Sequence, residues 1–237
     1  MIYKRPFLSI IIPLYNEENR LKNLSKVYQY LDKLEKDYEV LLVNDGSIDK
    51  TGKKLKNLNK KFKFQLISYT ANYGKGFAIR SGMLAAAGEY RIFTDIDLST
   101  PIEEFEKFMP YLKKFDVIIG SRRKIGSNLK RRQPFIRETL GQGFTLLSRI
   151  VLNLSISDFT CGFKCFSKKA AIEIFTRQKI DRWGFDSEIL FIAKKCGFKI
   201  KEVPVTWIDD PNSKVKFPQD IISSLIDLSR VRVSNYD

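Results

Sequence analysis

Histidine is absent from the 237 residues of this sequence. This absence excludes imidazole as a general base and His-containing zinc sites, so a bound metal would be held mainly by oxygen ligands. Cysteine is scarce: Cys161, Cys165 and Cys196 show no CxxC spacing, which argues against a disulfide framework or a zinc site. No apolar run approaches the roughly 18 to 20 residues that cross a bilayer. We therefore expect a cytoplasmic chain with reduced cysteines.

Acidic residues are outnumbered, with 27 Asp and Glu against 42 Lys and Arg, and the formal net charge is +15. This charge favours a polyanionic partner: nucleic acid, an anionic lipid surface or a phosphorylated substrate. The lysines of 53–61 fall on a helical face and read as solvated surface. The segment 122–137 differs, because it is basic without a helical stripe. A non-catalytic nucleic-acid-binding protein is the alternative that rests on charge alone.

Short apolar runs alternate with segments of helical periodicity, which predicts an α/β fold with a mostly parallel, doubly wound sheet. Its 43% hydrophobic content is enough for one sizeable domain. The predicted strands are 8–13, 39–43, 64–69, 90–94, 117–119 and a short one at 201–207. The predicted helices are 20–34, 51–61, 76–87, 103–115, 135–154, 169–175, 186–196 and 218–231.

Polar residues follow the first five strands, where ligands of such sheets bind. Asp95 and Asp97 come directly after a strand and are spaced so that both carboxylates can point to one side. Two such carboxylates can bind Mg²⁺ or Mn²⁺ that carries a substrate phosphate. The alternative is that the pair only ends a strand and caps the next helix.

Two further strand ends carry candidate ligands. Asp45 precedes a Gly-Ser turn, where its carboxylate can accept from a nucleobase imide; a helix cap at Ser47 or Asp49 is compatible with this. Lys75 lies in the string NYGKG at a helix entrance, where free amides and the helix dipole favour anions. The string is not a Walker A loop, because GxxxxGK[ST] is absent.

Taken in order, these strings resemble the glycosyltransferase family 2 enzymes of GT-A fold. The resemblance runs from Leu8 to about Val215 and is nearest to dolichyl- or polyprenyl-phosphate β-glucosyltransferases, with dolichyl-phosphate mannose synthases as more distant relatives. The supporting strings are IIPLYNEENRL (11–21), VNDGSIDKT (43–51), NYGKGFAIRSGM (72–83), FTDIDLSTP (93–101), GSR (120–122), RRQPFIRETLG (131–141), DFTCGFKCF (158–166), RWGFDSEIL (182–190) and SKV (213–215).

The resemblance implies one Rossmann-like GT-A domain over 1–237, with a nucleotide-sugar half at about 1–121 and an acceptor half at about 122–237. It implies an inverting, metal-dependent transfer of glucose from UDP-glucose to a polyprenyl or dolichyl phosphate. The alternatives are another donor, such as UDP-GlcNAc or GDP-mannose, or a saccharide hydroxyl as acceptor.

The resemblance also assigns roles to residues on the donor side. Asp95 and Asp97 would bridge Mg²⁺ or Mn²⁺ to the diphosphate, and Lys75 would lie near the base or the phosphates. The residues implied around the nucleoside are Pro13, Tyr15, Glu17 and Asp45.

On the acceptor side, a lipid monophosphate is already anionic and needs little help from a general base, but it must be held against its repulsion from the donor. Arginine suits this task. Arg122 and Arg137 join Asp97 as the predicted catalytic residues. The predicted neighbours are Arg131, Arg132 and Lys214, with solvated surface as the alternative for the two arginines. Asp186 and Glu188 would be bases for a hydroxyl acceptor; otherwise they contact the sugar or orient an arginine.

A lipid acceptor requires access to a membrane. We expect peripheral association through basic residues that attract anionic lipids, with 135–154 as an interfacial segment. The alternative for this segment is a core-packing helix. A membrane-protein partner could also supply docking, and no nucleic-acid partner is expected.

Overall fold

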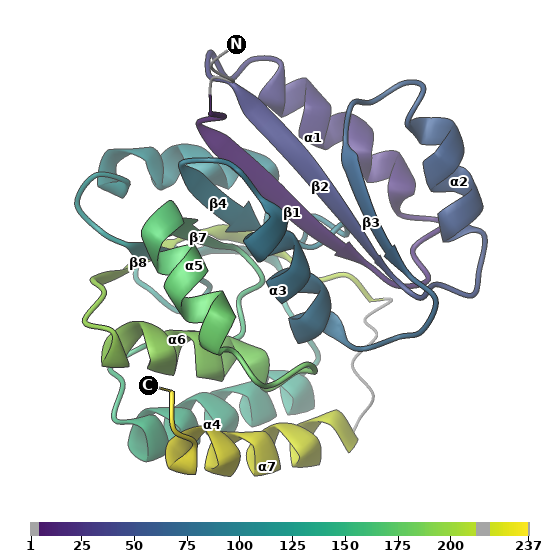
Figure 1. Cartoon of the computed structure of the whole chain (residues 1–237). Coiled ribbons are helices and arrows are strands. Elements are labelled where there is room, and N and C mark those ends of the chain that lie inside the picture. Colours follow the sequence, from purple (N-terminus) through teal and green to yellow (C-terminus); the bar gives the residue numbers. More distant parts are fainter. Residues whose placement is uncertain (1–4, 212–218, 237) are drawn as a thin grey trace.

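A seven-stranded sheet forms the centre of the protein in the computed structural model, which describes residues 5–211 and 219–236. The strand order is β3-β2-β1-β4-β7-β5-β8, and only β7 is antiparallel to its neighbours. The strands are β1 (Leu8–Leu14), β2 (Tyr38–Asp45), β3 (Gln65–Tyr69), β4 (Tyr90–Phe93), β5 (Val117–Ser121), β7 (Lys164–Ser167) and β8 (Ile200–Pro204). The predicted α/β fold with a mostly parallel sheet is confirmed (Figure 1).

Helices cover both faces of this sheet, because apolar side chains alternate between the two faces of each buried strand. One face packs against α1 (Leu24–Leu31) and α2 (Thr51–Leu58), and the other against α3 (Lys75–Ala85), α5 (Lys168–Arg177) and α6 (Phe185–Lys195). Two further helices, α4 (Phe135–Leu152) and α7 (Gln219–Val233), lie side by side beyond α6 (Figure 1).

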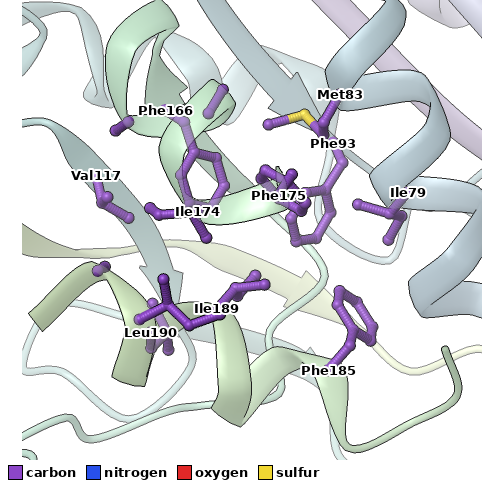
Figure 2. Close-up of a cluster of buried hydrophobic side chains, with 14 of the residues drawn as sticks. Ile79, Met83, Phe93, Val117, Phe166, Ile174, Phe175, Phe185, Ile189 and Leu190 are labelled. Atoms are coloured by element: carbon purple, nitrogen blue, oxygen red, sulfur yellow. The ribbon is translucent and has the colours of Figure 1, made fainter. Parts of the chain in front are cut away.

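The core on the α3 side is aromatic. Phe93 of β4 lies 6.1 Å from Phe166 of β7 and 6.0 Å from Phe185 of α6, measured between ring centroids (Figure 2). Phe175 of α5 meets Phe166 edge to face at 5.2 Å. All four rings are fully buried. They tie α5 and α6 to the sheet and so fix the residues that follow β4.

Parallel pairing places the ends of the first strands at one edge. In the β1–β2 ladder, Leu8 lies opposite Tyr38 and Leu14 opposite Asn44, and in the β1–β4 ladder Ile11 lies opposite Phe93. The strands β1, β2, β3, β4 and β5 run in the same direction. The loops predicted to carry ligands therefore emerge together.

Some elements differ from the sequence prediction. The expected helix at 103–115 is two 3₁₀ helices, η2 (Ile102–Lys107) and η3 (Met109–Tyr111), separated before Pro110, which cannot continue an α-helix. A third 3₁₀ helix, η1 (Leu21–Asn23), opens the expected helix at 20–34. The expected strand at 201–207 divides at Val205 into β8 and β9 (Thr206–Ile208).

The short strand β9 leaves the main sheet to pair with β6 (Asn128–Arg131), which was not predicted, in a separate two-stranded sheet. The strand β7 was not predicted either. Within residues 5–211 and 219–236, no helix combines the length and apolar character needed to cross a membrane.

Candidate active site

The loops that follow β1 and β2 are held together by side-chain to backbone hydrogen bonds. Asn16 has a left-handed backbone (φ 52°), its N–H donates to Ser47 Oγ at 2.9 Å, and its Oδ1 accepts from the Ile48 N–H at 2.9 Å. The N–H of Glu17 donates to Thr51 Oγ1 at 2.8 Å. These bonds join the loop after β1 to the loop after β2, and the two joined loops form a rim at the carboxyl ends of these strands.

Asp45 at the end of β2 organises the loop before α3. Its buried carboxylate accepts from Asn72 Nδ2 at 2.8 Å and from the N–H groups of Tyr73 and Gly74 at 2.9 and 2.8 Å. Burial raises the pKa of Asp45, and the two backbone donors oppose that rise only in part. This carboxylate thus shapes the loop that presents Lys75.

Lys75, the first residue of α3, forms an ion pair with Asp95, which follows β4. The Nζ of Lys75 lies 2.6 Å from Oδ1 and 2.8 Å from Oδ2 of Asp95. Gly162 packs against the pair so closely that a Cβ there would lie 2.3 Å from Asp95 Oδ2. Asp97, two residues further, accepts from the Ser99 N–H at 2.9 Å through Oδ1.

The carboxylates of Asp95 and Asp97 suit a hard divalent cation. Burial and the negative charge of Asp95 raise the pKa of Asp97, and a cation between the two carboxylates would offset their repulsion. Among the described residues, no group of three or more acidic or thiol side chains forms a complete cage. The set fits Mg²⁺ or Mn²⁺, which commonly use one or two carboxylates together with water and substrate phosphates.

Arg122, at the end of β5, is held by Asp158. Its Nε donates to Asp158 Oδ2 and its Nη2 donates to Asp158 Oδ1, both at 2.7 Å. The backbone N–H of Arg122 donates to the same Oδ2 at 2.9 Å, and Nη2 also donates to Thr160 Oγ1 at 2.8 Å. Its guanidinium carbon lies 5.4 Å from the ring centroid of Trp207. Burial alone would lower the pKa of Arg122, but Asp158 reverses this and the pKa is raised.

A cavity of about 400 Å³ extends from Lys75 to α4. It has a basic side and an apolar side, and it contains both tryptophans of the chain. Its lining is Lys75, Arg122, Arg123, Leu129, Arg132, Gln133, Arg137, Glu138, Leu140, Gly141, Gln142, Phe144, Thr160, Trp183, Asp186, Trp207 and Ser224. Lys75 and Arg122 are paired with Asp95 and Asp158, which lie outside the lining, and Asp186 is paired with Lys164. The lining still has a positive balance, because its other charged residues are Arg123, Arg132 and Arg137 against Glu138. Together with the apolar side, this charge suits an anion that carries an apolar group.

The predicted acceptor residues divide between this cavity and other places. Arg122, Arg132, Arg137 and Asp186 line it. Arg131 is not in the lining, and its Nε donates to the carbonyl of Asp209 at 2.9 Å. Lys214 lies outside the described residues.

Asp186 and Glu188 have different surroundings. Asp186 accepts a short hydrogen bond from Nζ of the fully buried Lys164. Glu188 is not in the cavity lining, and its carboxylate accepts from the N–H groups of Lys179 and Ile180, both at 2.9 Å, and from the hydroxyl of Tyr236. In this structure Glu188 secures the segment before α6 and the C-terminal residues.

On the donor side, Pro13 and Tyr15 lie at and just after the end of β1. Glu17 pairs with Arg20 at 3.0 Å, and Arg20 also contacts Asp210 at 2.8 Å. The rim after β1 is thereby tied to the end of the 206–211 segment.

Several residues of the site had no role in the sequence prediction. Arg123 lines the cavity and donates to the hydroxyl of Thr145 on α4. Trp183 and Trp207 line it as well, and Trp183 lies 5.6 Å from Lys75 Nζ, measured to the ring centroid. Asp158 pairs with Arg122 and Lys164 pairs with Asp186, so each holds a lining residue in place. The signals available were the second arginine of the GSRR string and the presence of only two tryptophans.

A mostly parallel sheet with a strand-end carboxylate pair beside a basic cavity is the arrangement expected of a glycosyltransferase of GT-A fold. The chain belongs to glycosyl transferase family 2, whose sequence pattern matches residues 9–175. Membership of a family of enzymes leaves the alternative of a non-catalytic nucleic-acid-binding protein without support.

Curated relatives agree with this assignment. A dolichyl-phosphate beta-glucosyltransferase of Trichomonas vaginalis is 36% identical over 96% of this chain and 73% of its own length. The dolichyl-phosphate beta-glucosyltransferase of Homo sapiens is 33% identical over 88% of this chain and 69% of its own. The resemblance stated from the sequence is confirmed.

Among solved structures, glucosyl-3-phosphoglycerate synthase from Mycobacterium tuberculosis shares the fold, with a TM-score of 0.69 at 15% identity over 97% of this chain and 80% of that one. That crystal structure holds Mn²⁺, uridine diphosphate and phosphoglyceric acid.

Proposed function

We propose that this protein transfers glucose from UDP-glucose to a dolichyl or polyprenyl phosphate, with inversion at the anomeric carbon and with Mg²⁺ or Mn²⁺ bound. The names of the relatives support the sugar and the lipid acceptor. The ligands of the mycobacterial synthase support UDP and a divalent cation. The donor is assigned to residues 1–121 and the acceptor to 122–237.

On the donor side, Pro13, Tyr15, Glu17 and Asp45 belong to the rim that would hold the nucleoside. Asp95 and Asp97 would hold the metal, which offsets the charge that develops on the leaving diphosphate. Lys75 contributes a second positive charge beside them.

On the acceptor side, an oxygen of the lipid phosphate attacks the anomeric carbon as the bond from that carbon to the diphosphate oxygen breaks, and the bonding electrons leave with UDP. No proton has to be removed. Arg122, Arg132 and Arg137, which all line the cavity, would hold the acceptor phosphate against its repulsion from the donor. A hydroxyl acceptor would need a general base, and Asp186, which lines the cavity and is paired with Lys164 through Oδ1, is the candidate for that alternative.

One observation carries the proposal: a single cavity is lined by Lys75, the partner of Asp95, by a cluster of arginines, and by the apolar side chains of Leu140 and Phe144 on α4. An acceptor that fills it presents an anion toward the donor and an apolar chain toward α4. A lipid phosphate has this form.

The same helix supports peripheral contact with an anionic membrane. Phe135 and Ile136 at the start of α4 are 82% and 68% exposed, and Ile150 near its end is 70% exposed and follows the exposed Arg149. Apolar side chains that enter the interface, together with basic residues near it, favour binding to anionic lipid. A membrane-protein partner at this surface is the alternative.

The test is a donor screen. Radiolabelled UDP-glucose, UDP-GlcNAc and GDP-mannose are each offered with polyprenyl phosphate and Mn²⁺, and lipid-linked label is measured after organic extraction. We expect label from UDP-glucose only, and its loss on addition of EDTA. Label from another donor would change the sugar, and the absence of any lipid-linked product would reject the acceptor.

A further inference from the structure

Both carboxylate oxygens of Asp95 are engaged by one ammonium group. The Nζ of Lys75 lies 2.6 Å from Oδ1 and 2.8 Å from Oδ2. Gly162 closes one side of the pair, at a distance where a Cβ would clash with Oδ2 and would lie 3.6 Å from Nζ. A divalent cation on Asp95 would need the same oxygens from the remaining open side.

We propose that Lys75 and the divalent cation compete for Asp95, and that the diphosphate of the nucleotide draws Lys75 away, so that metal and nucleotide bind cooperatively. This inference rests on the proposed function, which supplies the metal and the nucleoside diphosphate. It adds a role for Lys75: the residue keeps the metal site weak until the donor arrives.

The charges around Asp95 explain the coupling. Asp95 and Asp97 carry two negative charges, and Lys75 balances one of them. A divalent cation balances both, which leaves the ammonium of Lys75 as a surplus positive charge close to the metal. A diphosphate removes the surplus, because its oxygens can bind the cation and Lys75 together.

Asp186 gives the displaced ammonium a second partner. It is 6% exposed and lines the same cavity as Lys75. Its Oδ1 accepts from Lys164 Nζ, and Lys164 also donates to the carbonyl of Cys161 at 2.7 Å, which fixes Asp186 in place. Within the described part of the chain, no hydrogen bond to Asp186 Oδ2 is made.

The test measures Mn²⁺ binding to the whole chain, with and without UDP. The electron paramagnetic resonance signal of free Mn²⁺ reports how much metal is unbound. In wild type, UDP should strengthen Mn²⁺ binding by about 10- to 100-fold. In Lys75→Met, Mn²⁺ should bind at least about tenfold more tightly than in wild type without UDP, and UDP should add little. The added affinity should disappear in Lys75→Met with Asp95→Asn.

The matched control is Lys107→Met, which removes one lysine from a different ion pair, the 2.7 Å contact with Glu104. It should leave both Mn²⁺ affinities unchanged, and circular dichroism would verify that each variant is folded. If wild type binds Mn²⁺ with UDP but Lys75→Met binds Mn²⁺ alone no more tightly, the competition is refuted and the metal assignment stands. If no variant binds Mn²⁺ even with UDP, the metal dependence of the proposed function fails as well.

Discussion

Arg122 and Asp158 meet fork to fork, with Nε–Oδ2 and Nη2–Oδ1 distances of 2.7 Å. The two residues come from loops that follow β5 and precede β7, and the side chain of Asp158 is fully buried. The pair holds Arg122 at the wall of the acceptor cavity with its plane fixed. A bidentate pair of this kind positions a guanidinium more rigidly than a lysine could be held.

Asp158→Asn should destabilise the protein. The change breaks an ion pair whose carboxylate is fully buried and whose guanidinium is 16% exposed, and such a loss costs about 3–5 kcal/mol of unfolding free energy at neutral pH. Urea denaturation measures it. Asp32→Asn, at an exposed carboxylate that accepts from the Tyr38 hydroxyl, is the control and should cost about 0.5 kcal/mol or less.

The pH dependence of this difference follows from the pKa of Asp158. Burial raises that pKa, but the charge and hydrogen bonds of Arg122 outweigh burial and lower it to about 2 from the usual 3.8. A carboxylate with a depressed folded pKa stabilises above its unfolded pKa and loses this contribution as the pH falls through the folded one. The gap between wild type and Asp158→Asn should therefore narrow between about pH 4 and pH 2, and a constant gap would contradict the ionised pair.

The sheet edge could be predicted because local pattern encodes it. The apolar runs before Asp45 and before Asp95 are buried strands, and parallel pairing brings their ends together without further information. The pair Arg122–Asp158 could not be predicted, because the residues are 36 positions apart in the sequence. They come together because β7, which follows Asp158, pairs with β5, which precedes Arg122. The strand β7 was not predicted because it is short and begins with the charged residue Lys164, so its sequence lacks an apolar run.

The roles of Asp186 and Glu188 show a second limit of the sequence. Both are in the first turn of α6, two positions apart, and the pattern treats them alike. Two residues that are two positions apart on a helix point to different sides of it. Asp186 therefore reaches the cavity while Glu188 turns to the backbone at 179–180.

Tyr236→Phe tests this structural role of Glu188. The Tyr236 hydroxyl donates to Glu188 Oε1 at 2.9 Å in a fully buried contact. Loss of a hydrogen bond to a buried charged group should cost about 1.5–3 kcal/mol of stability. Sugar transfer measured well below the unfolding temperature should stay within about twofold of wild type. A strong loss of transfer with unchanged stability would instead place Glu188 in the reaction.

Gly162→Ala should damage the donor site through sterics. The added Cβ would lie 2.3 Å from Oδ2 and 3.1 Å from Cγ of Asp95, so this carboxylate must shift. We expect a loss of about 10- to 100-fold in metal affinity, as for other changes that reorient a ligand. Mn²⁺ binding in the presence of UDP measures it.

Gly143→Ala is the matched control for this change. Gly143 lies in α4, and an added Cβ there would meet nothing within 4 Å. The variant should keep metal affinity and gain about 0.5–1 kcal/mol of stability, because alanine favours the helix interior over glycine. Equal metal affinity in Gly162→Ala and Gly143→Ala would show that Asp95 does not bind the metal in the place inferred.

Asp97→Asn should separate stability from activity. Burial and the charge of Asp95 raise the pKa of Asp97, so its ionised form costs folding free energy at neutral pH. Asparagine keeps an Oδ1 that can accept from the Ser99 N–H and removes the charge. The variant should therefore unfold at a higher temperature than wild type while transfer falls by about 100-fold or more, the size expected when electrostatic support of a leaving group is lost.

The pH profile gives this prediction its sign. A carboxyl with a raised folded pKa destabilises above that pKa, and the penalty is relieved as the pH falls through it. The stability advantage of Asp97→Asn over wild type should thus be largest at neutral pH and should shrink on acidification. Thermal unfolding across this range, with transfer assayed at neutral pH, provides both readouts. A variant that is no more stable than wild type and still transfers sugar would show that Asp97 neither bears an electrostatic cost nor holds the metal.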